Sequence, residues 1–164
     1  MKSLVCCLAL AIAAASQPAM AEPRHMSQNP RVGLLAEIRF QAGSARLPDA
    51  SGSQLGRIAA WAFDNYDGLI VLDGHADRFG PARGNVRLSL RRAQQVRDQL
   101  LALGVDPNQI IVTAFGSEGR RHARVAIWGT RNSYEEVIGM RRKAKRILVP
   151  SALMHETPTV VGRR

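Results

Sequence analysis

Hydrophobic and polar residues form short, regular blocks along the first half of the chain. Residues 36–40 (AEIRF) alternate with a period of two, which predicts a short strand ended by the Ala-Gly-Ser turn at 42–44. Asp and Ser between Pro48 and Ser53 offer helix N-caps, and the next apolar residues recur at helical spacing up to about Tyr66. The apolar stripe of this predicted helix consists of Leu55, Ile58, Ala59 and Ala62.

A continuous apolar run, Leu69-Ile-Val-Leu72, lies between Gly68 and Gly74. Such a run is typical of a strand buried on both faces. A second amphipathic helix follows; the sequence predicts that it begins between Asn85 and Ser89 and stops at Gly104. Its apolar stripe comprises Leu88, Ala93, Val96, Leu100 and Leu103.

Two more strands are predicted, over residues 109–115 (QIIVTAF) and 123–127. The seven residues between them, GSEGRRH, are compatible with a hairpin. The predicted element order is βαβαββ, an α/β (α+β) fold with helices layered on a mixed sheet.

The C-terminal region predicts a third helix over about 130–149, stopped by Pro150. Ser133 and Glu136 form a capping-box pattern. The apolar face would consist of Val137, Met140, Ala144, Ile147 and Leu148. The basic run 141–146 would lie near the C-terminal end of this helix, where the helix dipole favours cations. We interpret it as a solvated helix end, and the alternative is a lipid- or partner-binding patch. Residues 150–164 are expected to form a flexible tail.

The N-terminus has the features of a secretory signal over residues 1–21. A basic start precedes an apolar stretch too short to cross a bilayer, and Ala19-Met-Ala21 is typical of a cleavage site. Cys6 and Cys7 lie inside this segment, so the expected mature chain has no disulfide, and neither is placed for lipid attachment. Residues 22–35 are predicted to be a linker and 36–129 a single domain, giving a soluble exported product without a transmembrane segment.

The whole chain carries a formal net charge of +10. A basic balance favours anionic partners such as nucleic acid, anionic lipid or cell-wall polymer. Because the chain is expected to be exported, nucleic acid is the least suitable of these partners.

The candidate chemistry lies in the connection GHADRFGPARGNVRLSLRRA, residues 74–93. A strand ending at Gly74 would place Asp77 and Arg92 at the carboxyl ends of strands, where α/β folds bind ligands. Opposite charges there can bind a zwitterion, with the ammonium on Asp77 and the carboxylate on the Arg92 fork. With Ser89 as N-cap, Arg91 and Arg92 would occupy the first helical turn, where the dipole disfavours cations. Spacing alone leaves open a simple Asp77–Arg92 salt bridge without a ligand.

These residues resemble a known family. The matching positions are Gly74-His-Ala-Asp77, Gly80, Asn85, Leu88-Ser89, Arg92-Ala93, Val96, Leu100 and Gly104-Val105. In this register they are similar to the signature of OmpA-like peptidoglycan-binding domains, and the resemblance covers about residues 38–128, including Phe40 and Gly43-Ser44.

The resemblance implies a βαβαββ two-layer domain that binds peptidoglycan non-covalently through meso-diaminopimelate of the peptide stem. It makes Asp77 and Arg92 the principal contacts. Backbone amides around Arg78 and Phe79, the Asn85 side chain and Arg124 would complete the site. Two departures stand out: Ala76 replaces the usual Thr, and 122–125 read HARV where the family has NRRV after a longer loop.

Other chemistries are less well supported. His75 and Asp77 could form half of a metal site, but His25, His122 and His155 are scattered. Ser117 lacks the nucleophile-elbow pattern, and no catalytic pair is evident, so neither an enzyme nor a cofactor is expected.

The preferred hypothesis is therefore a periplasmic wall-binding module that links an envelope complex to the wall, with association with the outer membrane left open. Its C-terminal helix and tail would face a protein partner. The alternative is a structural adaptor of a secretion, conjugation or motility complex that no longer uses the pocket.

Overall fold

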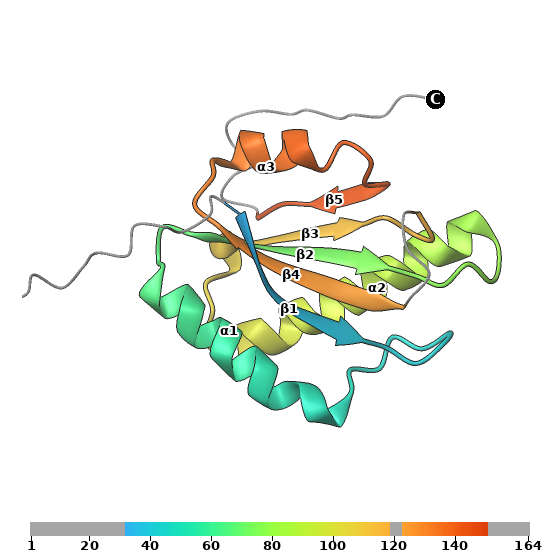
Figure 1. Cartoon of the computed structure of the whole chain (residues 1–164), viewed down its shortest axis with the longest axis horizontal. Coiled ribbons are helices and arrows are strands. Elements are labelled where there is room, and N and C mark those ends of the chain that lie inside the picture. Colours follow the sequence, from blue (N-terminus) through green and yellow to red (C-terminus); the bar gives the residue numbers. More distant parts are fainter. Residues whose placement is uncertain (1–31, 119–122, 151–164) are drawn as a thin grey trace, which may run out of the picture.

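The computed structural model describes residues 32–118 and 123–150, and within them two helices cover one face of a five-stranded sheet and one helix covers the other (Figure 1). The signal segment, most of the linker and the tail predicted above lie outside these residues. The strands are β1 (Val32–Arg39), β2 (Leu69–His75), β3 (Ile110–Ala114), β4 (Arg124–Thr130) and β5 (Arg146–Leu148). The α-helices are α1 (Gly52–Asp64), α2 (Ala82–Ala102) and α3 (Tyr134–Met140), with 3-10 turns at Asp49–Ser51 and Pro107–Gln109.

The sheet order is β1-β4-β2-β3-β5, with β2 and β3 parallel and the other pairs antiparallel. The predicted hairpin between the last two strands of the βαβαββ order is wrong. β3 and β4 are not neighbours, because β2 lies between them. The central position of β2 agrees with its apolar run, which is buried on both faces.

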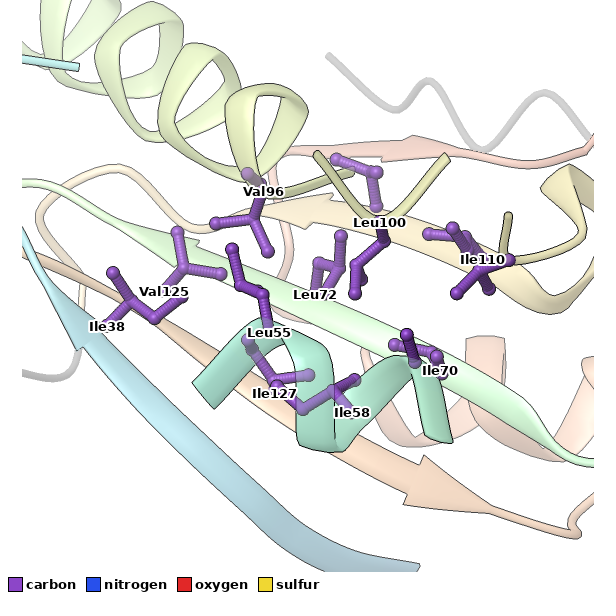
Figure 2. Close-up of a cluster of buried hydrophobic side chains, with 14 of the residues drawn as sticks. Ile38, Leu55, Ile58, Ile70, Leu72, Val96, Leu100, Ile110, Val125 and Ile127 are labelled. Carbon is purple, nitrogen blue, oxygen red and sulfur yellow. The ribbon is translucent and has the colours of Figure 1, made fainter. Parts of the chain in front are cut away.

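Alternate residues of the strands face α1 and α2 and form the main core (Figure 2). Leu55 and Ile58 of α1 and Val96 and Leu100 of α2 enter it. The strands contribute Ile38, Ile70, Leu72, Ile110, Val112, Val125 and Ile127. The helical and strand periodicities predicted these core positions, but two members of the expected α2 stripe are not part of the core: Leu88 is partly buried, and Leu103 is 39% exposed.

The opposite face carries a smaller core, formed by Val71, Ile111 and Val137 of α3. Trp128 and Ile147 pack against it. The C-terminal segment therefore belongs to the same folded unit as the sheet.

The third helix is shorter than predicted. The capping box is confirmed: the Ser133 hydroxyl accepts from the Glu136 amide at 3.3 Å, and the Glu136 carboxylate accepts from the Ser133 amide at 3.0 Å. The helix ends at Met140, however, and β5 pairs with β3, placing Ile147 opposite Thr113. The prediction of a helix to 149 is wrong because the open edge of β3 offers backbone partners that a continued helix would leave unpaired.

Two other boundaries also differ from prediction. β1 begins at Val32 rather than at 36, because Gly33 pairs with Gly129 of β4. α2 begins at Ala82, where the Pro81 carbonyl accepts from the Asn85 amide at 3.0 Å. Ser89 is therefore not the N-cap but lies within the helix, and the first turn does not contain Arg91 or Arg92.

Candidate functional site

β2 and α2 approach each other closely at Gly74, just before the loop that contains Asp77. A Cβ at Gly74 would overlap the Ser89 carbonyl group of α2, so only glycine fits there. The Ser89 hydroxyl accepts from the Gly116 amide at 3.1 Å, linking α2 to the chain that leaves β3. Gly74 and Ser89 therefore bring the ends of β2 and β3 together beneath the first half of α2.

Asp77 and Arg92 come together as predicted. The Arg92 Nη2 atom lies 3.8 Å from the Asp77 Oδ2 atom, a long ion pair. The Asp77 side chain keeps 18% of its surface exposed, whereas the Arg92 side chain has none. A solvent-borne ligand can therefore reach Asp77 directly but not Arg92.

Arg92 is held by backbone carbonyls on three sides. Its Nε donates to Ser44 at 2.7 Å, its Nη1 to His75 at 3.0 Å and its Nη2 to Gln41 at 2.9 Å. The guanidinium also lies 5.5 Å from the centre of the Phe40 ring. Burial lowers the pKa of Arg92, and the Asp77 carboxylate opposes that shift. The arginine thus ties the loop 41–44 to the end of β2 and provides a buried positive charge behind Asp77.

The loop after Asp77 projects into solvent. Phe79 is 87% exposed, and Arg78 is also exposed. Gly80 has φ +95°, a conformation that favours glycine. Among the described residues, the amides of Arg78, Phe79 and Gly80 donate no hydrogen bond to a backbone carbonyl. These amides lie just before the N-terminus of α2, so their dipoles favour an anion.

Asn85 lies beneath this loop. It is 5% exposed, and its Nδ2 donates to the Gly80 carbonyl at 3.4 Å. It therefore supports the loop from below.

Arg124 lies at the same end of the sheet but on the face away from α2. It pairs in register with His75, and its Nε lies 3.4 Å from the Glu37 Oε1 atom. On the same face, the His75 ring stacks on Phe115 with centroids 5.0 Å apart. Of the predicted site residues, Arg124 is the one that the structure does not bring to Asp77.

A second arginine–aspartate pair was not predicted. Arg141, which follows α3, makes a two-pronged contact with Asp73 of β2, with N–O distances of 3.3 and 3.2 Å. Thr113 donates to the same carboxylate at 2.6 Å, and the Arg141 guanidinium lies 5.7 Å from the Trp128 ring centre. The available signal was the charge of Asp73 directly after the apolar run of β2, since buried carboxylates are almost always paired. The sequence spacing did not identify the partner.

Metal sites and membrane spans were sought within 32–118 and 123–150. No three His, Cys, Asp or Glu side chains group together there to hold an ion. No helix in those ranges is both long enough and apolar enough to cross a membrane.

Helices on a mixed sheet, with a charged loop at the carboxyl ends of β2 and β3, define a class of α+β domain with solved examples. One is the peptidoglycan-associated lipoprotein from Burkholderia pseudomallei, with a TM-score of 0.55 and 23% identity, covering 57% of this chain and 89% of that one. Another is the C-terminal domain of Helicobacter pylori MotB, with a TM-score of 0.54 and 20% identity, covering 66% and 93%. At these identities the similarity shows the fold alone.

The chain belongs to the OmpA family, whose profile matches residues 39–129. A peptidoglycan-associated lipoprotein of Mesorhizobium japonicum is 31% identical over 92 residues, which cover 56% of this chain and 55% of that protein. Outer membrane protein A of Yersinia pseudotuberculosis is 32% identical over 96 residues, covering 57% and 27%. The chain therefore covers about half of the first relative's length and about a quarter of the second's. The family resemblance and the α+β fold expected from the sequence are confirmed.

Proposed function

We propose that this protein binds peptidoglycan non-covalently in the periplasm, through the zwitterionic end of meso-diaminopimelate in the peptide stem. The observation that carries the proposal is the accessible Asp77 carboxylate, followed in the chain by backbone amides that bond to no backbone carbonyl within residues 32–118 and 123–150. Several relatives are named peptidoglycan-associated lipoproteins, which supports the same ligand.

Each charge of the ligand has a matching group. The ligand ammonium binds the Asp77 carboxylate in a charge-assisted hydrogen bond. The ligand carboxylate lies against the amides of Arg78 and Phe79, at the positive end of the α2 dipole. Asn85 holds this loop in place through Gly80.

Arg92 has a different role from the direct fork contact expected from the sequence. Three of its five N–H groups are engaged by carbonyls, and the side chain has no exposed surface. We assign it the task of fixing the loop 41–44 and placing a positive charge behind Asp77. A direct contact between Arg92 and the ligand carboxylate requires that loop to move. Arg124 contributes only if the wall polymer also reaches the opposite face.

The binding module would connect an envelope complex to the wall, at the periplasmic side of the outer membrane. The second candidate is a structural adaptor of such a complex that does not use the pocket. The complete burial of Arg92 favours this second candidate, because it removes one of the two charges from the surface. Neither candidate involves a covalent change to the polymer.

The test is sedimentation of the mature chain, from residue 22, with purified diaminopimelate-type sacculi. Wild type is expected in the pellet, and free meso-diaminopimelate is expected to release it. Asp77→Asn should remain in the supernatant, because an amide lacks the charge that holds the ammonium. Asp64→Asn, which changes an exposed carboxylate on α1, is the matched control and should sediment like wild type.

Two results would overturn the proposal: wild type that stays in the supernatant, or Asp77→Asn that sediments equally well. In either case the adaptor function would be the better account. A melting curve for each variant shows whether a loss of binding reflects unfolding.

A further inference from the structure

The outer side of α2 carries three arginines that the proposed pocket does not use. Arg83, Arg87 and Arg91 follow one another at intervals of four residues, and all three are exposed. We call them the α2 arginine ridge. Residues four apart share one helical face, so the ridge extends about 12 Å along the helix.

The three arginines of the ridge are unfavourable for the stability of the helix itself. Like charges four residues apart destabilise a helix. Arg83 lies in the first turn, where no acidic residue balances the dipole. Within the described ranges, no carboxylate forms an ion pair with Arg83, Arg87 or Arg91. An anion from outside the domain would therefore stabilise this surface.

The ridge runs into a hollow of about 480 Å³ on the surface of α2. It is lined by five residues of α2 and two of the loop before α1: Arg91, Gln94, Gln95, Arg97 and Asp98, with Ala45 and Arg46. The Gln amides can both donate to and accept from peptide or sugar groups. Asp98 lies 3.7 Å from Arg97, which offsets its negative charge.

The hollow adjoins the proposed pocket through a shared loop. Ala45 and Arg46 line the hollow, and the neighbouring Ser44 carbonyl is bound by Arg92 behind Asp77. At its other end, the ridge begins two residues after Pro81, directly beyond the loop that contains Asp77. A polymer that occupies the pocket can therefore continue along α2 without leaving the domain surface.

We propose that the α2 arginine ridge and the hollow form a second contact surface for the carboxylates of stem peptides on the same wall polymer. This inference rests on the proposed function. An extended peptide advances about 3.3–3.6 Å per residue, so three or four residues match the length of the ridge. An anionic membrane is a poorer fit, because α2 presents no exposed large apolar side chain between the three arginines.

The test compares two triple variants with equal charge change. The ridge variant carries Arg83→Gln, Arg87→Gln and Arg91→Gln. The control carries Arg57→Gln, Arg142→Gln and Arg146→Gln, which are also exposed and lie elsewhere. Each is assayed with sacculi, with free meso-diaminopimelate, and with phosphatidylglycerol vesicles.

The ridge variant is expected to bind sacculi about tenfold more weakly, given the modest strength of each exposed charge contact. The control should change less than about twofold on the same scale. Both should bind free meso-diaminopimelate like wild type, since a single amino acid at Asp77 does not extend along the ridge. Wild-type binding should weaken more than that of the ridge variant as salt increases, because salt screens exposed charges.

Equal sacculus binding by the two triple variants would overturn the ridge while leaving the pocket proposal intact, provided that Asp77→Asn has lost binding. A loss confined to the vesicles would also overturn it, because the partner would then be a lipid phosphate. Failure of wild type to bind sacculi would overturn both proposals.

Discussion

Two arginine–aspartate pairs in this domain differ in their access to water. Asp73 and Arg141 are each about 10% exposed at the side chain, and Thr113 accompanies them. Asp77 retains more exposure and lies farther from its arginine, at 3.8 Å. The first pair is saturated by internal partners and is structural, whereas the second leaves one carboxylate available to a ligand.

Removing the charge of Arg141 should destabilise the domain. Arg141→Leu leaves the Asp73 carboxylate buried without its cation, and the expected loss is about 3–5 kcal/mol in the free energy of unfolding. Urea unfolding measures it. Arg142→Leu, at an exposed neighbour, should change stability by less than about 0.5 kcal/mol. Asp73→Val combined with Arg141→Leu should recover most of the loss; a double variant as unstable as the single would contradict this account.

The close contact between β2 and α2 leads to a second prediction, which concerns a single added methyl group. Gly74→Ala places a methyl group against the Ser89 carbonyl and should cost about 1–3 kcal/mol or more. Gly56→Ala is the control, because a Cβ there meets nothing within 4 Å and the position lies inside α1. It should stabilise the domain by about 0.5–1 kcal/mol. Equal melting temperatures for the two variants would argue against the tight contact.

At the scale of elements, the C-terminal segment completes the domain. α3 covers Val71 and Ile111 through Val137, and β5 closes the edge of β3. The Lys145 amide also donates to the Ala114 carbonyl at 2.7 Å. The segment from α3 to β5 is therefore part of the folded domain rather than a separate helix outside it.

Two truncations separate the core from the tail. Deleting 132–164 removes α3 and β5 and exposes Val71 and Ile111, so the product should unfold at a lower temperature and aggregate. Deleting 151–164 leaves every described contact in place and should preserve the melting temperature and sacculus binding. Calorimetry and sedimentation measure the two effects. A stable, monomeric product of the longer deletion would show that the second core is dispensable.

At the scale of the whole molecule, the sheet has two different ends. β1, β2 and β3 run in one direction toward the loop with Asp77, and β5 runs back (Figure 1). Val32 at the start of β1 and Leu148 at the end of β5 therefore lie at the end opposite the candidate site. A domain attached through either end would present the loop that contains Asp77 outward.

This polarity predicts the effect of bulky fusions. A folded domain joined before residue 22 should leave the affinity for sacculi within about twofold of wild type. The same domain inserted between Phe79 and Gly80 should abolish binding, because it occupies the loop beside Asp77. Pelleting assays compare the two fusions, and strong inhibition by the N-terminal fusion would count against the arrangement.

The predictions that succeeded depended on periodicity and local chemistry. The stripe of α1, the central part of the α2 stripe, the apolar run of β2 and the capping box of α3 reflect short-range rules that each segment satisfies by itself. The start of α2 was a local misassignment, whereas the predicted hairpin and the predicted long C-terminal helix failed because they depended on a distant partner. The apolar spacing from Val137 to Leu148 suits a helix, but the edge of β3 converts residues 146–148 into a strand.

The amino-acid sequence alone therefore determined the family, the βαβαββ order and the pairing of Asp77 with Arg92, because these follow from residue types at fixed spacing. Only the tertiary structure decided that β2 separates β3 from β4, that Arg141 belongs to Asp73, and that Arg92 is enclosed by the carbonyls of Gln41, Ser44 and His75. These outcomes depend on contacts between residues that are far apart in the sequence. Burial at these contacts determines which charged side chains remain accessible to a ligand.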